Sequence, residues 1–161
     1  GQRRTKVVPI VQRLWDSAVI LDYLSGNPNV QPDCDNLIRQ ASNGNMEIVV
    51  TSVTEAEVAY LNGLSDEESE MRIREFFSRS YIIPVAIDTH IATTARRLIR
   101  IYHLKGADAI HLATAIKYHI PILETTDPDL LAINGLEGNP LITVQHPTYI
   151  GTQPMFPTLT G

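Results

Sequence analysis

Short apolar segments alternate with longer amphipathic ones along most of this chain, and this alternation restricts the possible folds more than any other feature. The segments 10–15, 46–52, 81–87, 121–126 and 141–146 are apolar and have the length of strands. Between them, apolar residues recur at helical spacing in 17–26, 34–42, 54–64, 66–80, 90–103 and 106–119. Strands separated by helices predict a parallel sheet, because parallel neighbours need long crossover connections. We therefore expect an α/β fold, a three-layer α/β/α sandwich with a central parallel sheet.

Length and composition favour one folded unit followed by a tail. A chain of 161 residues, 43% of them hydrophobic, usually builds one core. We expect a single domain over 1–146 and a tail over 147–161, where Pro and Gly recur without periodicity. Cys34 is the only cysteine, and no apolar run reaches the ~20 residues that cross a bilayer. We expect a cytoplasmic protein without a membrane partner.

Four acidic residues follow the carboxyl ends of predicted strands or open the next helix. In open α/β sheets, ligands bind at this edge. Asp16 closes the first strand, and Asp127 follows the strand at 121–126. Glu57 lies in the first turns of the helix after the second strand, and Asp108 opens the helix at 106–119. Four carboxylates from separate parts of the chain are thus predicted at one edge.

Each acid also has an ordinary structural interpretation. Asp16 is a good helix N-cap, and Asp127 before a proline favours a turn. Glu57 resembles its neighbour Glu55 as an exposed first-turn acid, and Asp108 would be stabilised by a helix N-terminus by ~0.3–1 kcal/mol. Gathered at one edge, however, like charges repel, and an oxygen-seeking cation is the usual compensation.

The four acidic segments resemble the four motifs of the PIN-domain nucleases, in the family's order. They read WDSAVIL, TSVTEAEV, GADAIHLATA and LETTDPDLL, and the resemblance spans about 13–144. It implies a PIN-like, Rossmann-like fold in which the acids hold one or two Mg²⁺ or Mn²⁺ ions. The implied ligands and catalytic residues are Asp16, Glu57, Asp108 and Asp127, and the implied supporting residues are Ser17 and Thr125.

The resemblance also implies an activity and partners. Many bacterial members are VapC-type toxins of toxin–antitoxin pairs that cut single-stranded RNA. Two divalent ions about 3.5–4 Å apart can activate water and stabilise both the phosphate and the leaving oxygen. Products would then carry 5′-phosphate and 3′-hydroxyl ends. An antitoxin or the second subunit of a homodimer is a candidate partner for the tail. Ser17 stands where the family more often has Thr, which keeps the hydroxyl.

Other polar residues suggest weaker alternatives. Asp108 and His111 share a helix face and have a spacing that could bind a transition metal, but a packed histidine is the simpler interpretation without a third ligand. A metal-independent ribonuclease would need a histidine pair and a lysine. His103, Lys105 and His119 offer these groups, but no motif links them.

The formal net charge of −5 argues against nucleic-acid binding through a broad basic surface. The densest basic cluster is Arg96, Arg97 and Arg100, which is either a solvated helix face or an RNA-backbone contact. In the helix at 66–80, we expect Met71, Ile73, Phe76 and Phe77 on the buried side, with the two phenylalanines as candidates for a homodimer surface.

Two classes of function remain open from the sequence. The first is a metal-dependent endoribonuclease. The second is a catalytically inactive PIN-like module that binds RNA or protein. Retention of all four acids favours the enzyme, because a scaffold has no need of mutually repelling carboxylates.

Overall fold

The computed structural model describes residues 10–148 and contains the predicted parallel sheet. Its five strands lie in the order β3-β2-β1-β4-β5, and every neighbouring pair is parallel. The strands are β1 (Val11–Trp15), β2 (Met46–Thr51), β3 (Ile82–Val85), β4 (Ile122–Glu124) and β5 (Thr143–Gln145). The central position of β1 places the first acidic segment in the middle of the sheet edge.

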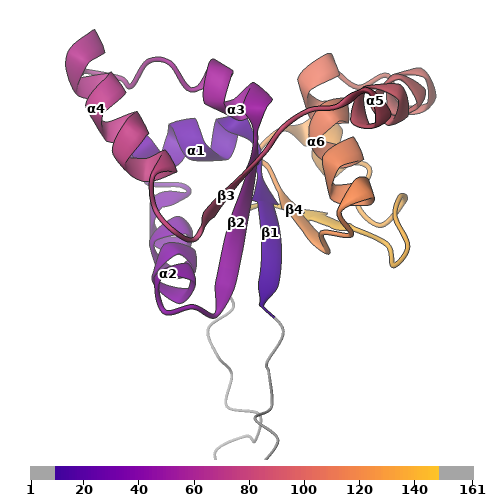
Figure 1. Cartoon of the computed structure of the whole chain (residues 1–161), viewed down its shortest axis with the longest axis horizontal. Coiled ribbons are helices and arrows are strands. Elements are labelled where there is room, and N and C mark those ends of the chain that lie inside the picture. The colour runs from indigo at the N-terminus through magenta and orange to yellow at the C-terminus, as the bar shows by residue number, and fades with distance from the viewer. Residues whose placement is uncertain (1–9, 149–161) are drawn as a thin grey trace, which may run out of the picture.

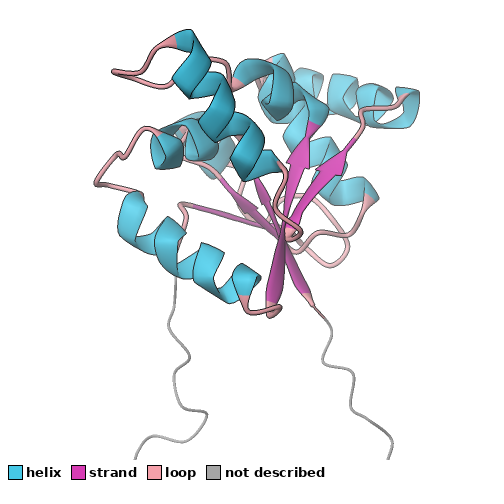
Figure 2. Ribbon diagram, turned by 60° about the vertical axis from the view of Figure 1, so that its left-hand side comes forward, coloured by secondary structure: helices cyan, strands magenta, loops and turns pink. Residues whose placement is uncertain are grey.

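Helices cover both faces of the sheet, which confirms the three-layer sandwich (Figures 1 and 2). The helices are α1 (Ser17–Leu24), α2 (Gln31–Ser42), α3 (Ser52–Glu57), α4 (Asp66–Phe77), α5 (Thr89–Tyr102), α6 (Gly106–Lys117) and α7 (Pro128–Leu131). Alternate strand residues enter two separate cores, as period-2 side-chain geometry requires. Leu14 and Val49 pack with α5 and α6, whereas Trp15, Ile48 and Val50 pack with α1, α2 and α4.

The structure corrects the sequence prediction in several helices. Helix α3 ends at Glu57 rather than near 64, because Val58 and Leu61 turn into the core and the Leu61 N–H bonds the Ser69 hydroxyl at 3.1 Å. Helix α2 begins at Gln31, three residues earlier than predicted, with a proline in its first turn. A short helix, α7, replaces the turn predicted after Asp127.

The prediction for the buried side of α4 holds for Ile73 and Phe76 but not for Met71. Met71 is 69% exposed, because it lies on the side of the helix away from the core. Phe76 is fully inside the core, against Tyr23 and Phe77, so its ring is not available to a dimer surface. Phe77 is half-buried.

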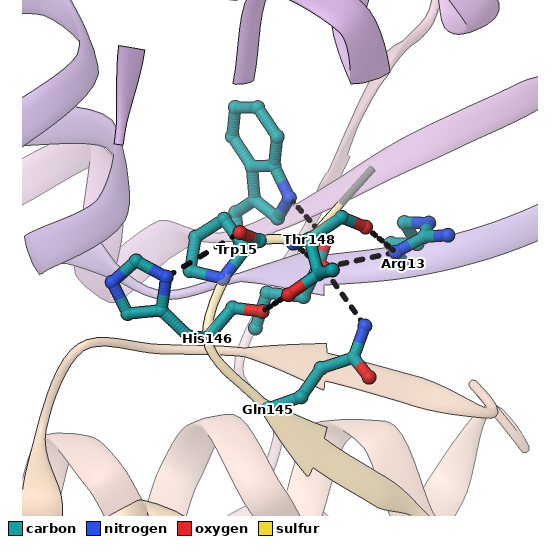
Figure 3. A network of polar contacts seen from close by, with 7 residues as sticks. Arg13, Trp15, Gln145, His146 and Thr148 are labelled. Atoms are coloured by element: carbon teal, nitrogen blue, oxygen red, sulfur yellow. Dashed lines mark hydrogen bonds and ion pairs between the residues drawn. The ribbon is translucent and has the colours of Figure 1, made fainter. Parts of the chain in front are cut away.

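A buried carboxylate joins the central strands to the end of the described chain. Glu124 has no exposed surface and accepts hydrogen bonds from Arg13 at 2.9 Å, Trp15 at 2.9 Å, Gln145 at 3.1 Å and the Thr148 N–H at 3.1 Å. Figure 3 shows Arg13, Trp15, Gln145 and Thr148 converging there. The tail expected from 147 lies outside the described residues from 149 onward.

No helix within residues 10–148 has both the length and the apolar character needed to cross a membrane.

Candidate active site

The four predicted acids line one cavity of about 300 Å³ at the carboxyl edge of the sheet. Asp16 follows β1 and caps α1, whereas Glu57 is the last residue of α3. Asp108 lies in the first turn of α6, and Asp127 caps α7 after β4. The fold therefore brings together carboxylates that are up to 111 positions apart in the sequence, from Asp16 to Asp127.

Asp16 is held by both of its carboxylate oxygens. Its Oδ1 accepts the Val19 N–H at 3.0 Å, which makes it the N-cap of α1. Its Oδ2 accepts the Thr125 hydroxyl at 2.5 Å. Thr125 Oγ1 in turn accepts the Asp127 N–H at 3.0 Å, so one buried hydroxyl joins two of the acids.

Asp108 and Asp127 both line the cavity, and the nearby Asp127 adds to the effect of burial in raising the pKa of Asp108. Asp127 Oδ1 accepts the Asp129 N–H at 2.8 Å, and its Oδ2 lies 3.9 Å from Lys105 Nζ. Asp108 is only 8% exposed, and its Oδ2 is a buried oxygen without a hydrogen-bond partner. Such an orphaned acceptor is costly unless a donor or a cation meets it.

Crowding of the carboxylates changes their acidity. Burial raises the pKa of Asp16 to about 6, against the Thr125 and Val19 hydrogen bonds that lower it, and the charges of Asp127 and Asp22 raise it further. Burial, the charge and hydrogen bond of Asp127 and the charge of Asp16 raise the pKa of Asp108 to about 7. Both carboxyls therefore resist carrying a negative charge without compensation.

Glu57 is exposed, and one hydrogen bond directs its side chain. Ser17 Oγ donates to Glu57 Oε1 at 2.7 Å and lies 3.1 Å from Thr54 Oγ1. Both hydroxyls are buried. Ser17 thus contacts one of the acids, as a supporting residue would.

His111 lines the same cavity but is a packed residue. It is 1% exposed, its Nδ1 lies 3.4 Å from Thr51 Oγ1, and burial lowers its pKa to about 4. The ring is therefore neutral near pH 7. His103 and His119 are exposed and do not line this cavity, so the residues of the metal-independent alternative are not brought together.

The donor set fits a hard divalent cation in its chemistry. Carboxylate oxygens are the ligands that Mg²⁺ and Mn²⁺ prefer, and the orphaned Asp108 Oδ2 is a free acceptor in the cavity wall. Within residues 10–148, no three His, Cys, Asp or Glu side chains are already close enough to form a ligand set. A cation held by three or more of these residues would therefore require their side chains to move together.

Basic residues divide between the cavity and a distant helix face. Arg96, Arg97 and Arg100 are exposed on α5 and do not line the cavity, and Arg97 pairs with Glu137 at 2.8 Å. Lys105 does line it. The sequence did not predict Lys105 at the acidic site, although its position three residues before Asp108 was a usable signal. It did not predict Thr54 beside Ser17 either, and the cap of α3 is Thr51.

Comparisons with known proteins identify the family and the fold of the chain. The model of the PIN domain family matches residues 14–136. A toxin–antitoxin complex from Klebsiella pneumoniae contains a similar chain, with 27% identity, a TM-score of 0.60, and coverage of 86% of this chain and 99% of that one. No curated protein sequence matches.

Two more distant structures share the fold. VapBC2 from Rickettsia felis, bound to a DNA fragment from its promoter, has a TM-score of 0.62 and 15% identity, with 84% of this chain and 98% of that one covered. The Mycobacterium tuberculosis toxin VapC20, which cleaves the sarcin-ricin loop, has a TM-score of 0.60 and 12% identity, with 74% and 93% covered. Because the family model spans well over half of the sequence, including all four acids, the chain belongs to the PIN-domain family.

Proposed function

We propose that this protein is a divalent-metal-dependent endoribonuclease that hydrolyses phosphodiester bonds in single-stranded RNA. The observation that carries the proposal is the convergence of Asp16, Glu57, Asp108 and Asp127 on one cavity. Lys105 lines the same cavity, with its Nζ 3.9 Å from Asp127 Oδ2, but four carboxylates outnumber this one positive charge. A buried Asp108 oxygen also lacks a hydrogen-bond partner. Carboxylates grouped in this way can bind a divalent cation, and the cation can in turn bind a phosphate group.

In this proposal, the four acids are metal ligands and catalytic residues. Bound Mg²⁺ or Mn²⁺ would supply a nucleophilic water at neutral pH and offset the charge that develops on the phosphate. Thr125 fixes Asp16 and, through the Asp127 N–H, the start of α7. Ser17 directs Glu57. Lys105, the cation lining the cavity, is suited to the RNA phosphate, and Arg96, Arg97 and Arg100 are candidate RNA contacts outside it.

We further propose that the protein is the toxin of a toxin–antitoxin pair, present as a homodimer in the cytoplasm. Support comes from its similarity to a chain of a toxin–antitoxin complex, which covers nearly all of that chain. FitAcB from Neisseria gonorrhoeae is a further structural neighbour, with a TM-score of 0.54 and 19% identity. An antitoxin protein is accordingly the expected partner.

Calorimetric titration of the intact protein with Mn²⁺ separates this proposal from the inactive module. The nuclease requires Mn²⁺ binding that weakens in Asp108→Asn, because the substitution removes a carboxylate from the cavity wall. If no divalent ion binds at millimolar concentration, the nuclease proposal is wrong and the non-catalytic module remains.

A further inference from the structure

Glu57 is the most exposed of the four acids. It is the last residue of α3, a helix of only six residues, and its side chain is exposed. Asp16 and Asp127, by contrast, each cap a helix through a backbone N–H. Whatever fixes α3 therefore also fixes the position of Glu57 at the cavity.

A network of buried hydroxyls and one backbone N–H leads from the core to Glu57. The Thr54 N–H donates to Thr51 Oγ1 at 3.4 Å, which caps α3. Thr54 Oγ1 lies 3.1 Å from Ser17 Oγ, and Ser17 Oγ donates to Glu57 Oε1 at 2.7 Å. Because the Ser17 proton is committed to Glu57, the Thr54 hydroxyl is the donor to Ser17. Thr51 and Thr54 have no exposed surface, so these bonds are shielded from water.

The inner end of this network is on α6. His111 Nδ1 lies 3.4 Å from Thr51 Oγ1, and His111 is 1% exposed. His111 follows Asp108 by three residues, so both side chains lie on the same face of α6. Helix α6 thus places Asp108 at the cavity and, one turn later, places His111 against Thr51, the cap of α3.

We infer that Thr54, Thr51 and His111 are positioning residues that hold Glu57 at the acid cavity through the Ser17 hydroxyl. This inference rests on the proposed function, because it assigns the network to the ligand role of Glu57. Removing the Thr54 hydroxyl takes away the donor to Ser17, which frees Ser17 to rotate and releases the Glu57 carboxylate. Removing the Thr51 hydroxyl or the His111 ring acts through the cap of α3 instead. Mutation of a residue that hydrogen-bonds a metal ligand typically lowers metal affinity by about 10–100-fold.

The test compares Thr54→Val, which removes the hydroxyl, with Thr54→Ser, which keeps it. Thr114→Val is the matched control, because Thr114 is equally buried but its hydroxyl bonds only the Ile110 carbonyl of its own helix, at 2.7 Å. We expect Mn²⁺ affinity, measured by calorimetry, to fall about tenfold in Thr54→Val. It should stay near wild type in Thr54→Ser and Thr114→Val. Amide exchange of residues 52–57 in the metal-free protein should be faster in Thr54→Val alone.

His111→Leu and His111→Asn provide an independent pair if Thr54→Val fails to fold. The Asn side chain can place a polar atom near Thr51, whereas Leu cannot, so only Leu should weaken Mn²⁺ binding and speed exchange in α3. Equal Mn²⁺ affinity and equal α3 exchange in Thr54→Val and Thr114→Val would overturn the inference and leave the nuclease proposal intact. Wild-type protein that binds no Mn²⁺ would overturn the nuclease proposal instead, and α3 exchange would then decide the network alone.

Discussion

At the scale of single residues, two of the acids both cap a helix and line the cavity, positions that the sequence offered as alternatives. Asp16 and Asp127 each use Oδ1 to cap a helix, as their ordinary interpretation predicts. Their Oδ2 atoms face Thr125 and Lys105 instead. Asp108 makes no such cap, since the N-cap of α6 is Lys105 without a side-chain hydrogen bond. A helix-end position in the sequence therefore does not exclude an acid from the cavity.

The substitution Asp16→Asn should distinguish the helix-capping role of Asp16 from the role of its negative charge. Asn also caps helices, because its Oδ1 can accept from the Val19 N–H while its Nδ2 donates to Thr125 Oγ1. It carries no charge in a site where burial raises the pKa of Asp16 to about 6. We expect RNA cleavage to be abolished and thermal stability without metal to be unchanged or higher, by up to about 2 kcal/mol. An unfolded Asp16→Asn variant would contradict this and make the cap the dominant role.

Stability without metal should depend on pH through Asp108. Its folded-state pKa of about 7 lies above the ordinary value, so the folded protein keeps a proton that the unfolded chain releases, and stability falls as pH rises towards 7. Asp16 acts in the same sense up to about pH 6. Burial lowers the pKa of His111 to about 4, so below about pH 6.5 the unfolded chain binds a proton that the folded protein does not. In that range His111 makes stability rise with pH, which opposes the effect of the two aspartates.

The informative range is therefore pH 6.5 to 7.5. Chemical unfolding there should show a loss of stability with rising pH in wild type with EDTA, and a flat profile in Asp108→Asn. Identical slopes for the two proteins would remove Asp108 as the titrating group.

At the scale of elements, the sequence predicted the strands and long helices well, since their apolar periodicity reflects the two cores they build. It failed where tertiary contacts override local pattern. Residues 58–64 have helical spacing, but burial of Val58 and Leu61 against α4 ends α3 early. The hydroxyl network was also not predictable, because the bonds join α1, α3 and α6, and no spacing within one element records them.

The Glu124 network gives a prediction about how the strands are held together. Arg13 pairs with Glu124 at 2.9 Å, and the Glu124 carboxylate is entirely buried, so Arg13→Ala leaves a buried charge without its cation. We expect unfolding free energy to fall by about 3 kcal/mol. Arg97→Ala breaks the more exposed pair with Glu137 and should cost less than about 1 kcal/mol. Urea unfolding measures both, and equal losses would contradict this role for Glu124.

At the scale of the whole molecule, the proposed function requires a protein of negative net charge to bind RNA, which is also negative. The net charge is −5, and the acids of the cavity repel phosphate unless cations intervene. Individual basic residues should therefore contribute more to RNA binding than they would on a protein with a positive net charge. Arg96 and Arg100 are exposed on α5, and Arg97 is engaged with Glu137.

Replacing Arg96 and Arg100 by Ala should weaken RNA binding and reduce its salt dependence by about one to two phosphate contacts. Arg39→Ala is the control, because Arg39 is an exposed arginine on α2, in the opposite layer. Fluorescence anisotropy with labelled single-stranded RNA at several salt concentrations gives both quantities. Unchanged binding and slope would make the α5 cluster a solvated helix face.

The most direct test is cleavage of end-labelled single-stranded RNA by the purified protein with Mn²⁺ or Mg²⁺, beside EDTA and Asp16→Asn controls. Catalysis by the acid cavity predicts cleavage that requires both the metal and Asp16 and leaves 5′-phosphate ends. Cleavage that persists in EDTA or in Asp16→Asn, or no cleavage across a broad panel of RNAs, would contradict a metal-dependent nuclease built on these four carboxylates.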